Sequence, residues 1–393
     1  MSLHDRFPLF KAVPHEAIIV SLLLAVLSAL MRFIWISRKK SARQRELQQW
    51  IEKAREERES KTSATLHMEE NTEHTDEFLS LSAKELAERF RSNEIDPTEA
   101  VAFYAKRCRK YGRSERGLNS ITEELYDEAF QRAKDLLTKT KKSALPFFGV
   151  PISIKECHSV EGCYSTAGMA CRLRARVKTD CLVVHILKEA GAIPLCLGNT
   201  IQLMMLTESI NNIWGRSRNP WDLTRTPGGS SGGDAALVAA GMVPFAMGSD
   251  VAGSIRTPAA WCGITGFKPT PSRVSFQGNM RPKKGDRQGT GSVLPTVMGP
   301  LARTVDDCAL FMETVCVPEM WEADCNTAPL PFDRKQYQAS GKLKIGYFYT
   351  DDWFEPCSAA KRALSESIQK MKDAGHECIP FTPPTDGWFN YGL

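Results

Sequence analysis

Residues 226–256 read "TPGGSSGGDAALVAAGMVPFAMGSDVAGSIR", and this glycine- and serine-rich stretch is the most informative part of the chain. Flexible linkers share this composition, but they lack apolar runs such as residues 235–240 and 243–247. Glycines packed this closely free backbone N–H groups to point at a ligand, or let another segment approach. The stretch therefore predicts a functional site, with a purely structural glycine loop as the alternative.

The serines of this stretch, Ser230, Ser231 and Ser254, are candidate nucleophiles. A serine hydroxyl is a weak nucleophile and needs a nearby base. Residues 228–232 match the G-x-S-x-G pattern of α/β-hydrolases, whose nucleophile follows a strand, but the ten preceding residues contain two prolines and predict a loop. A phosphate-binding loop is a second alternative, although no Lys-Ser or Lys-Thr follows the glycines.

Lys155 is a candidate base, because it ends the apolar stretch "GVPISIKE" at residues 149–156. This stretch predicts a buried strand, and burial lowers the pKa of a lysine until the neutral amine can accept a proton. The alternative is a structural ion pair between Lys155 and Glu156 or another carboxylate. The position of Lys155 alone does not separate the two interpretations.

The composition excludes several classes of protein. The chain has 393 residues, 42% of them hydrophobic and 25% charged, which is enough for a large core in one or two domains. The net charge of +5 is diffuse, so no nucleic-acid partner is predicted. Twelve cysteines without a CxxC pair argue against a zinc ribbon or thioredoxin-like site and indicate reduced, mostly buried thiols. We expect no metal and no cofactor.

The N-terminal region predicts a membrane helix over residues 17–36, preceded by a flank of residues 1–16. Residues 17–31 are uncharged and would form a helix of roughly 22 Å, which continues past Arg32 to span the ~30 Å hydrocarbon core. A secretory signal peptide is the alternative, but no A-x-A cleavage site follows. Basic residues concentrate after the span, which places the remaining chain in the cytoplasm.

The segment 37–80 is highly charged and predicts an exposed helix followed by a flexible tether. Globular patterning begins near Leu81. "SAKELAERF" begins with a capping-box pattern at Ser82 and Glu85, and "DPTEAVAFYAKRCRKY" predicts a second helix with Pro97 in its first turn. Strand and helix patterns then alternate, which favours a largely parallel sheet covered by helices.

At "GGSSGG", "GSDVAGSIR" and "CGITGFKPT" the sequence resembles the amidase signature family, and "GVPISIKE" and "GPLARTVDD" match further family segments. Within that family, "STAGMACR", "NIWGRSRNPWD" and the N-terminal apolar segment look most like the membrane-anchored fatty-acid amide hydrolases of animals. The resemblance implies an α/β fold with a twisted mixed sheet covered by helices on both faces. It also implies a serine hydrolase that cleaves fatty-acid amides to fatty acid and amine.

Carried over residue by residue, the resemblance implies that Lys155 is the base, Ser230 a bridging serine on a cis peptide, and Ser254 the nucleophile that forms the acyl-enzyme. The implied oxyanion hole consists of the backbone N–H groups of Val251, Ala252, Gly253 and Ser254. Ser231 and Arg256 would be auxiliary residues. Met204 falls where the family lines its substrate channel, with ordinary core packing as the alternative.

The same resemblance gives expectations about partners and location. We expect a lipid amide substrate and a membrane as partners, with a second copy of the chain as a candidate. The expected location is the endoplasmic reticulum, with the catalytic domain on the cytosolic face. Family members continue beyond the position of Leu393, so the domain of residues 81–393 is expected to be incomplete at its C-terminal end. The alternative function is an inactive truncated protein that binds lipid or a full-length partner.

Overall fold

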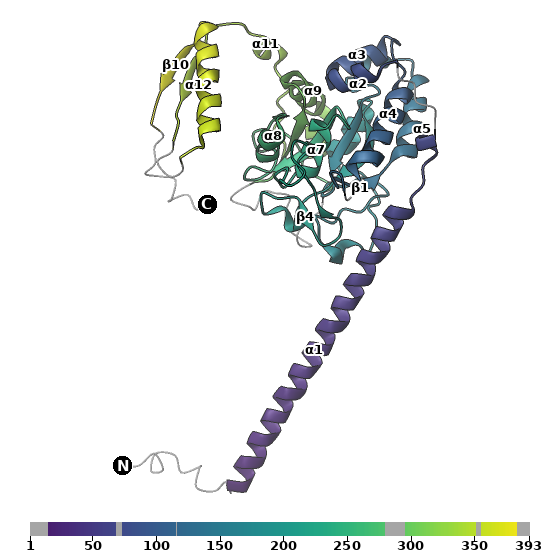
Figure 1. The fold of residues 1–393 in the computed structure, drawn as a ribbon, viewed down its shortest axis with the longest axis vertical. Coiled ribbons are helices and arrows are strands. Elements are labelled where there is room, and N and C mark those ends of the chain that lie inside the picture. Colours follow the sequence, from purple (N-terminus) through teal and green to yellow (C-terminus); the bar gives the residue numbers. More distant parts are fainter. Residues whose placement is uncertain (1–14, 68–72, 115, 280–294, 351–354, 383–393) are drawn as a thin grey trace. The chain divides into compact units, whose positions relative to one another are not determined.

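The computed structural model describes residues 15–67, 73–114, 116–279, 295–350 and 355–382 (Figure 1). It divides into two compact units, Met1–Phe332 and Asp333–Leu393. The expected domain over residues 81–393 thus extends across parts of both units. The boundary falls in the mostly exposed segment "PLPFD" at residues 329–333, whose two prolines are typical of a linker between units.

A six-stranded sheet forms the centre of the first unit, in the order β1-β3-β2-β6-β8-β7. The three central strands, β3 (Ile193–Gly198), β2 (Pro151–Lys155) and β6 (Phe245–Asp250), run parallel. The outer strands β1 (Ile121–Glu124), β8 (Val297–Ala302) and β7 (Thr265–Gly266) join by antiparallel pairing. The prediction of a mixed α/β sheet is confirmed.

Helices cover both faces of this sheet, because side chains of successive strand residues point to opposite faces. In β6, Phe245 and Met247 belong to one apolar cluster and Ala246 to the other. The cluster around Ala246 includes residues of α4 (Pro97–Arg107), α5 (Tyr126–Leu137), α7 (Gly232–Ala239) and α8 (Arg256–Cys262). The opposite cluster includes residues of α6 (Leu182–Glu189), α9 (Val305–Val315) and α10 (Pro318–Ala323).

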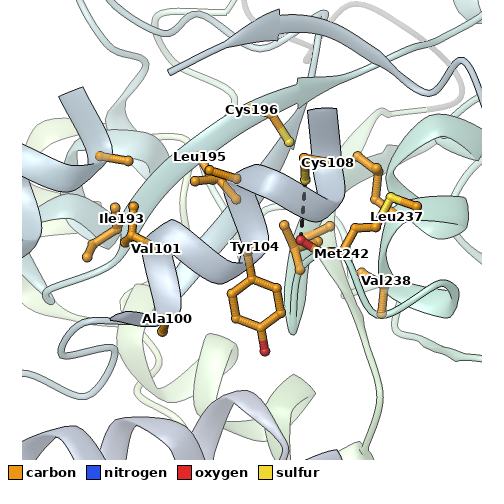
Figure 2. Close-up of a cluster of buried hydrophobic side chains, with 14 of the residues drawn as sticks. Ala100, Val101, Tyr104, Cys108, Ile193, Leu195, Cys196, Leu237, Val238 and Met242 are labelled. Atoms are coloured by element: carbon orange, nitrogen blue, oxygen red, sulfur yellow. Dashed lines mark hydrogen bonds between the residues drawn. The ribbon is translucent and has the colours of Figure 1, made fainter. Parts of the chain in front are cut away.

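Figure 2 shows the core between α4, β3 and α7, where Tyr104, Leu195 and Leu237 are buried. Cys108 begins the single π-helical turn Cys108–Gly112, and its Sγ donates to the carbonyl oxygen of Met242 at 3.4 Å. All twelve cysteines are free thiols, and eight of them are buried. The prediction of reduced and mostly buried cysteines is confirmed.

The predicted helix starts are also confirmed. α3 (Ala83–Arg91) begins with a complete capping box between Ser82 and Glu85, and α4 begins at Pro97 after the N-cap Asp96. The capping hydrogen bonds satisfy backbone N–H groups that a helix leaves without partners at its first turn. Shorter elements of the first unit are η3 (Ala64–His67), α2 (Thr75–Ser80), η5 (Lys142–Ala144), η6 (Ala170–Arg172), η7 (Gln202–Met204), β4 (Ile210–Asn211) and β5 (Gly215–Arg216).

The predicted membrane span falls within the first half of α1 (His15–Ser60). None of the helices in the described ranges is both long and apolar enough to cross a membrane, so the span over residues 17–36 is not confirmed. The uncharged run of residues 17–31 covers only about 22 Å of helix before Arg32, against a hydrocarbon core of ~30 Å. Residues 1–14 of the predicted flank lie outside the described residues.

The prediction of an exposed helix and flexible tether over residues 37–80 is wrong in part. Ile51 and Ala54 of α1 are buried against Ile213 and Trp214, so this half of α1 has an apolar face on the body. Within the predicted tether Phe78 is fully buried, while residues 68–72 lie outside the described residues. The sequence did not predict these contacts, because a few apolar residues among many charged ones give only a weak periodic pattern.

The second unit is a strand–helix–strand motif, in line with the predicted alternation of strands and helices. β9 (Lys344–Tyr347) and β10 (Glu377–Pro380) pair in parallel, and α12 (Ser358–Asp373) connects them. The short helix α11 (Arg334–Tyr337) precedes them. A helical crossover is the usual connection between parallel neighbouring strands.

Phe245→Ala is predicted to destabilise the first unit by roughly 3–5 kcal/mol, because it leaves a cavity in a close-packed core. Phe245 is fully buried, and its ring centroid lies 5.1 Å from that of Phe147 and 6.0 Å from that of Phe311. Urea denaturation followed by tryptophan fluorescence measures the loss. The matched control Phe267→Ala removes a ring that is 44% exposed, and an equal effect of both variants would contradict this description of the core.

Candidate active site

The candidate site forms where β2 ends at Lys155, whose side chain is fully buried. Lys155 Nζ donates hydrogen bonds to Ser230 Oγ at 2.7 Å and to Ser249 Oγ at 3.1 Å. Burial lowers the pKa of Lys155, because the ammonium loses its hydration. The site thus holds a lysine that is easier to deprotonate than one in water, in direct contact with a serine hydroxyl.

Glu156 is not the partner of Lys155, which removes the alternative of a local ion pair between them. The Glu156 carboxylate accepts hydrogen bonds from Thr166 N at 2.7 Å, Thr166 Oγ1 at 2.5 Å and Ala167 N at 2.8 Å. Burial raises the pKa of Glu156 to about 8. Its role is to hold the backbone of the loop that follows β2.

Ser230 lies in the glycine-rich loop before α7, and the peptide bond between Gly229 and Ser230 is cis, as the family resemblance implies. The loop is held from the other side by Thr200, whose Oγ1 donates to the carbonyl oxygen of Ser230 at 2.6 Å. A Cβ atom on Gly229 would lie 1.9 Å from the carbonyl oxygen of Glu208. Only glycine therefore fits at this close approach, which is one reason for the glycine-rich composition.

Ser231 connects the loop before α7 to the segment that follows β6. Its N–H donates to the carbonyl oxygen of Ser254 at 3.1 Å, and its Oγ donates to the carbonyl oxygen of Ser249 at 3.3 Å. Ser254 is thereby held beside Ser230 in space, although 24 residues separate them in the sequence. Ser254 is partly buried, and within the described ranges its hydroxyl makes no hydrogen bond. The structure thus contains the Lys155–Ser230 contact but no Ser230–Ser254 hydrogen bond.

The expected oxyanion hole needs one correction. Gly253 donates its N–H to Asp250 Oδ1 at 2.8 Å, so this group already has a partner and is not available to a substrate. Among the described residues, the N–H groups of Val251, Ala252 and Ser254 make no hydrogen bond. Gly253 has φ +125°, a conformation that side chains disfavour, whereas Ala252 has no positive φ. Three of the four predicted donors therefore stay available.

Arg256 acts through Asp250. The Arg256 guanidinium donates to both Asp250 oxygens, at 3.1 and 3.0 Å, and the N–H groups of Gly253, Ile255 and Arg256 donate to the same carboxylate. Burial alone would raise the pKa of Asp250, but these hydrogen bonds lower it to about 2. The carboxylate therefore fixes the turn that contains the candidate oxyanion donors and Ser254.

Met204 is the predicted channel residue, and the structure places it at the end of η7, partly buried and with φ 58°. It is not part of the described apolar clusters, which disfavours the alternative of ordinary core packing. Its neighbours Leu203, Met205 and Leu206 are 54%, 77% and 68% exposed. An apolar surface therefore follows Thr200, the residue that contacts Ser230.

Sequence reasoning missed three polar residues of the site: Ser249, Asp234 and Asp250. Asp250 had a usable signal, because an aspartate followed by glycine three residues later often accepts hydrogen bonds from the turn it begins. Ser249 and Asp234 had none. Ser249 reaches Lys155 only through the pairing of β2 with β6, and Asp234 looks like an ordinary first-turn acid of α7.

Arg256→Gln is predicted to destabilise the protein in a pH-dependent way. The pKa of Asp250 in the folded state lies below its unfolded value of about 3.9, so its hydrogen bonds stabilise the fold above that pH and are lost as the pH falls towards 2. The difference in unfolding free energy between wild type and variant, from guanidinium denaturation, should be constant from pH 5 to 8 and shrink below about pH 4.

The control for this experiment is Arg225→Gln, which removes an exposed ion pair with Asp222. Exposed pairs contribute little to stability, so this variant should match wild type at neutral and at acidic pH. A destabilisation by Arg256→Gln that stays the same down to pH 2 would contradict the assignment to Asp250.

Comparisons with known proteins agree with this site. The amidase family model matches residues 99–386. Fatty-acid amide hydrolase 1 of Sus scrofa is 36% identical over 368 residues, which are 93% of this chain and 60% of the pig protein. Vitamin D3 hydroxylase-associated protein of Gallus gallus is 35% identical over 346 residues, which are 86% of this chain and 72% of the chicken protein.

A solved structure of fatty acid amide hydrolase superposes with a TM-score of 0.71 and 28% identity, over 80% of this chain and 55% of that one. The chain thus spans little more than half the length of that structure and about three fifths of the pig relative. The family model covers most of the chain, and the glycine-rich loops, the cis peptide and the buried lysine lie within the matched residues. The chain belongs to the amidase signature family.

Proposed function

We propose that the protein is an amidase that hydrolyses fatty-acid amides through an acyl-enzyme on Ser254. The observation that carries the proposal is the buried hydrogen bond of 2.7 Å between Lys155 Nζ and Ser230 Oγ, beside the segment that holds Ser254. A buried lysine with a lowered pKa supplies the base that a serine nucleophile requires.

The first half of the proposed reaction forms the acyl-enzyme. Neutral Lys155 accepts the hydroxyl proton of Ser230, and Ser230 accepts the proton of Ser254 as the Ser254 Oγ attacks the amide carbonyl carbon. The negative charge then develops on the carbonyl oxygen. The N–H groups of Val251, Ala252 and Ser254 are the available donors that would stabilise this oxyanion.

The second half releases both products. The proton on Lys155 returns through Ser230 to the nitrogen of the leaving group, and the C–N bond breaks to give a free amine. Protonation is required at this step because an amide anion is a very poor leaving group. Water then attacks the acyl carbon while Ser230 takes its proton and passes its own to Lys155. The bond between the acyl carbon and Ser254 Oγ breaks, the proton returns through Ser230 to Ser254 Oγ, and the fatty acid is released.

The acyl part of the proposed substrate is an apolar chain. The relatives named fatty-acid amide hydrolase support this class. The exposed side chains of Leu203, Met205 and Leu206 follow directly after Thr200, which contacts the backbone of Ser230. An apolar surface a few residues from Thr200 favours a long acyl chain, because burying the chain against these side chains contributes binding free energy.

Lys155→Ala is predicted to lower kcat/KM for a long-chain fatty-acid primary amide by about 10²- to 10⁴-fold, because proton transfer loses its base. The loss should be smaller for the matching ester, whose leaving group needs less protonation. Release of ammonia or alcohol measures both rates. Lys134→Ala removes an exposed lysine and is the control. Amide hydrolysis that is unchanged in Lys155→Ala would contradict the mechanism.

A fluorophosphonate probe is predicted to label Ser254, with loss of labelling in Ser254→Ala and residual labelling in Ser231→Ala. The covalent adduct is located by mass spectrometry of the digested protein. Labelling that survives in Ser254→Ala but disappears in Ser231→Ala would assign the nucleophile to Ser231 instead. A wild-type protein that neither reacts with the probe nor hydrolyses the amide would support the inactive lipid-binding alternative.

A further inference from the structure

The carboxyl group of Asp234 is fully buried in the first turn of α7, and the proposed mechanism does not use it. Ser153 Oγ donates to Asp234 Oδ1 at 2.6 Å. The other oxygen, Oδ2, is buried and has no hydrogen-bond partner among the described residues. A buried carboxylate oxygen without a partner is destabilising, so this group calls for a functional explanation.

Strand register places Asp234 next to Lys155. Ser153 and Lys155 lie two residues apart on β2, so their side chains point to the same face of the sheet. Lys155 pairs in register with Gly198 of the neighbouring strand β3, and a Cβ atom on Gly198 would lie 2.2 Å from Asp234 Oδ1. The Asp234 carboxyl therefore occupies the space where residue 198 would have a side chain, beside the position on β3 that pairs with Lys155.

The other titratable groups around Asp234 and Lys155 are either neutral at physiological pH or already paired with an opposite charge. Asp250 forms its ion pair with Arg256. Burial lowers the pKa of His158 to about 4, so this imidazole is neutral at physiological pH. Burial also raises the pKa of the Cys157 thiol, which keeps it protonated. Among the described residues Asp234 forms no ion pair, so its charge is left to act on Lys155.

We propose that Asp234 is a positioning residue that stabilises the protonated form of Lys155 while Lys155 holds the proton taken from Ser230. The inference rests on the proposed function, because it assigns a role within the same proton transfer. The proton passes from Ser230 Oγ to Lys155 Nζ and back, and Asp234 contributes its negative charge without receiving the proton. A carboxylate acts in the same way on the histidine of a Ser-His-Asp triad.

The charge of Asp234 is itself sensitive to pH. Burial raises the pKa of Asp234 to about 7, although the Ser153 hydrogen bond and the charge of Lys155 both favour its ionised form. Above that pH the carboxylate is ionised and supports the protonated lysine, and below it the carboxyl is neutral and this support is lost. Asp234 and Lys155 should therefore titrate as a coupled pair.

The first test measures Lys155 directly by NMR of protein with ¹³C-labelled lysine, with the Lys155 signal assigned by its absence in Lys155→Met. In wild type the signal should shift in two steps, one of them near pH 7. In Asp234→Asn, which keeps the Oδ1 acceptor but loses the charge, the titration midpoint should fall by about one pH unit and only one step should remain. Ser153→Ala keeps the carboxyl but removes the hydrogen bond that favours its ionised form, so both steps should remain and the Asp234 step should move to higher pH.

The second test is the pH dependence of kcat/KM for the long-chain fatty-acid amide. In Asp234→Asn the acidic limb of the kcat/KM profile should move to lower pH by about one pH unit. The plateau of kcat/KM should lie about tenfold below that of wild type, because the lysine becomes a weaker base. A merely structural role would lower the rate without moving the limb. Ser153→Ala keeps the Asp234 carboxyl but loses the hydrogen bond that favours its ionised form, so its limb should not move to lower pH, and it serves as the matched control.

The outcomes separate the two proposals. A wild-type Lys155 signal with a single step, or a midpoint that Asp234→Asn leaves unchanged, overturns the role of Asp234 even where amide hydrolysis is confirmed. A shifted midpoint in a protein that hydrolyses no amide supports the coupling of the two groups and contradicts the proposed function. The two-step titration of wild type needs no substitution at Asp234, so it decides the matter even where Asp234→Asn does not fold.

Discussion

Burial of the Lys155 amine at the end of β2 is the constraint on which the rest of the site depends. An ammonium group without water is strongly destabilised, so the surrounding segments must supply hydrogen-bond partners and keep the pKa low. Ser249 arrives on the neighbouring strand β6 and Ser230 on the loop before α7. The parallel pairing of β2 with β6 brings Ser249 to the amine, and the loop before α7 brings Ser230, so the site lies at the central strands.

The glycines are explained by the space this arrangement leaves. Gly229 contacts the Glu208 backbone, and Gly198 leaves room for the Asp234 carboxyl. In both places a Cβ atom would overlap with another heavy atom, so only glycine leaves enough space for the neighbouring group. The loops are consequently close-packed rather than flexible, as the nearly complete burial of residues 227–238 shows. Gly228 and Gly253 also have an unusual backbone angle, with φ of 84° and 125°.

Much of the fold could be predicted from the sequence where the signal is local. The capping box at Ser82, the strand ending at Lys155 and the strand–helix–strand pattern of the second unit all depend on residues a few positions apart. Ser249, Asp234 and the buried face of α1 depend on strand register and on packing between distant segments. Short sequence patterns do not predict such contacts between distant segments. The residues that contact Lys155 were therefore identified only from the family resemblance or from the structure.

Three buried acids near the end of β2 show how the surroundings give one functional group different roles. Glu156 accepts hydrogen bonds from the loop at Thr166 and acts as a structural clamp. Asp250 is held ionised by Arg256 and by backbone N–H groups, and it shapes the turn that holds Ser254. Asp234 accepts a hydrogen bond from the Ser153 hydroxyl, and the charge of Lys155 adds to this compensation. Because a low-dielectric interior strengthens every charge interaction, the acid with the fewest partners has the largest influence on the lysine beside it.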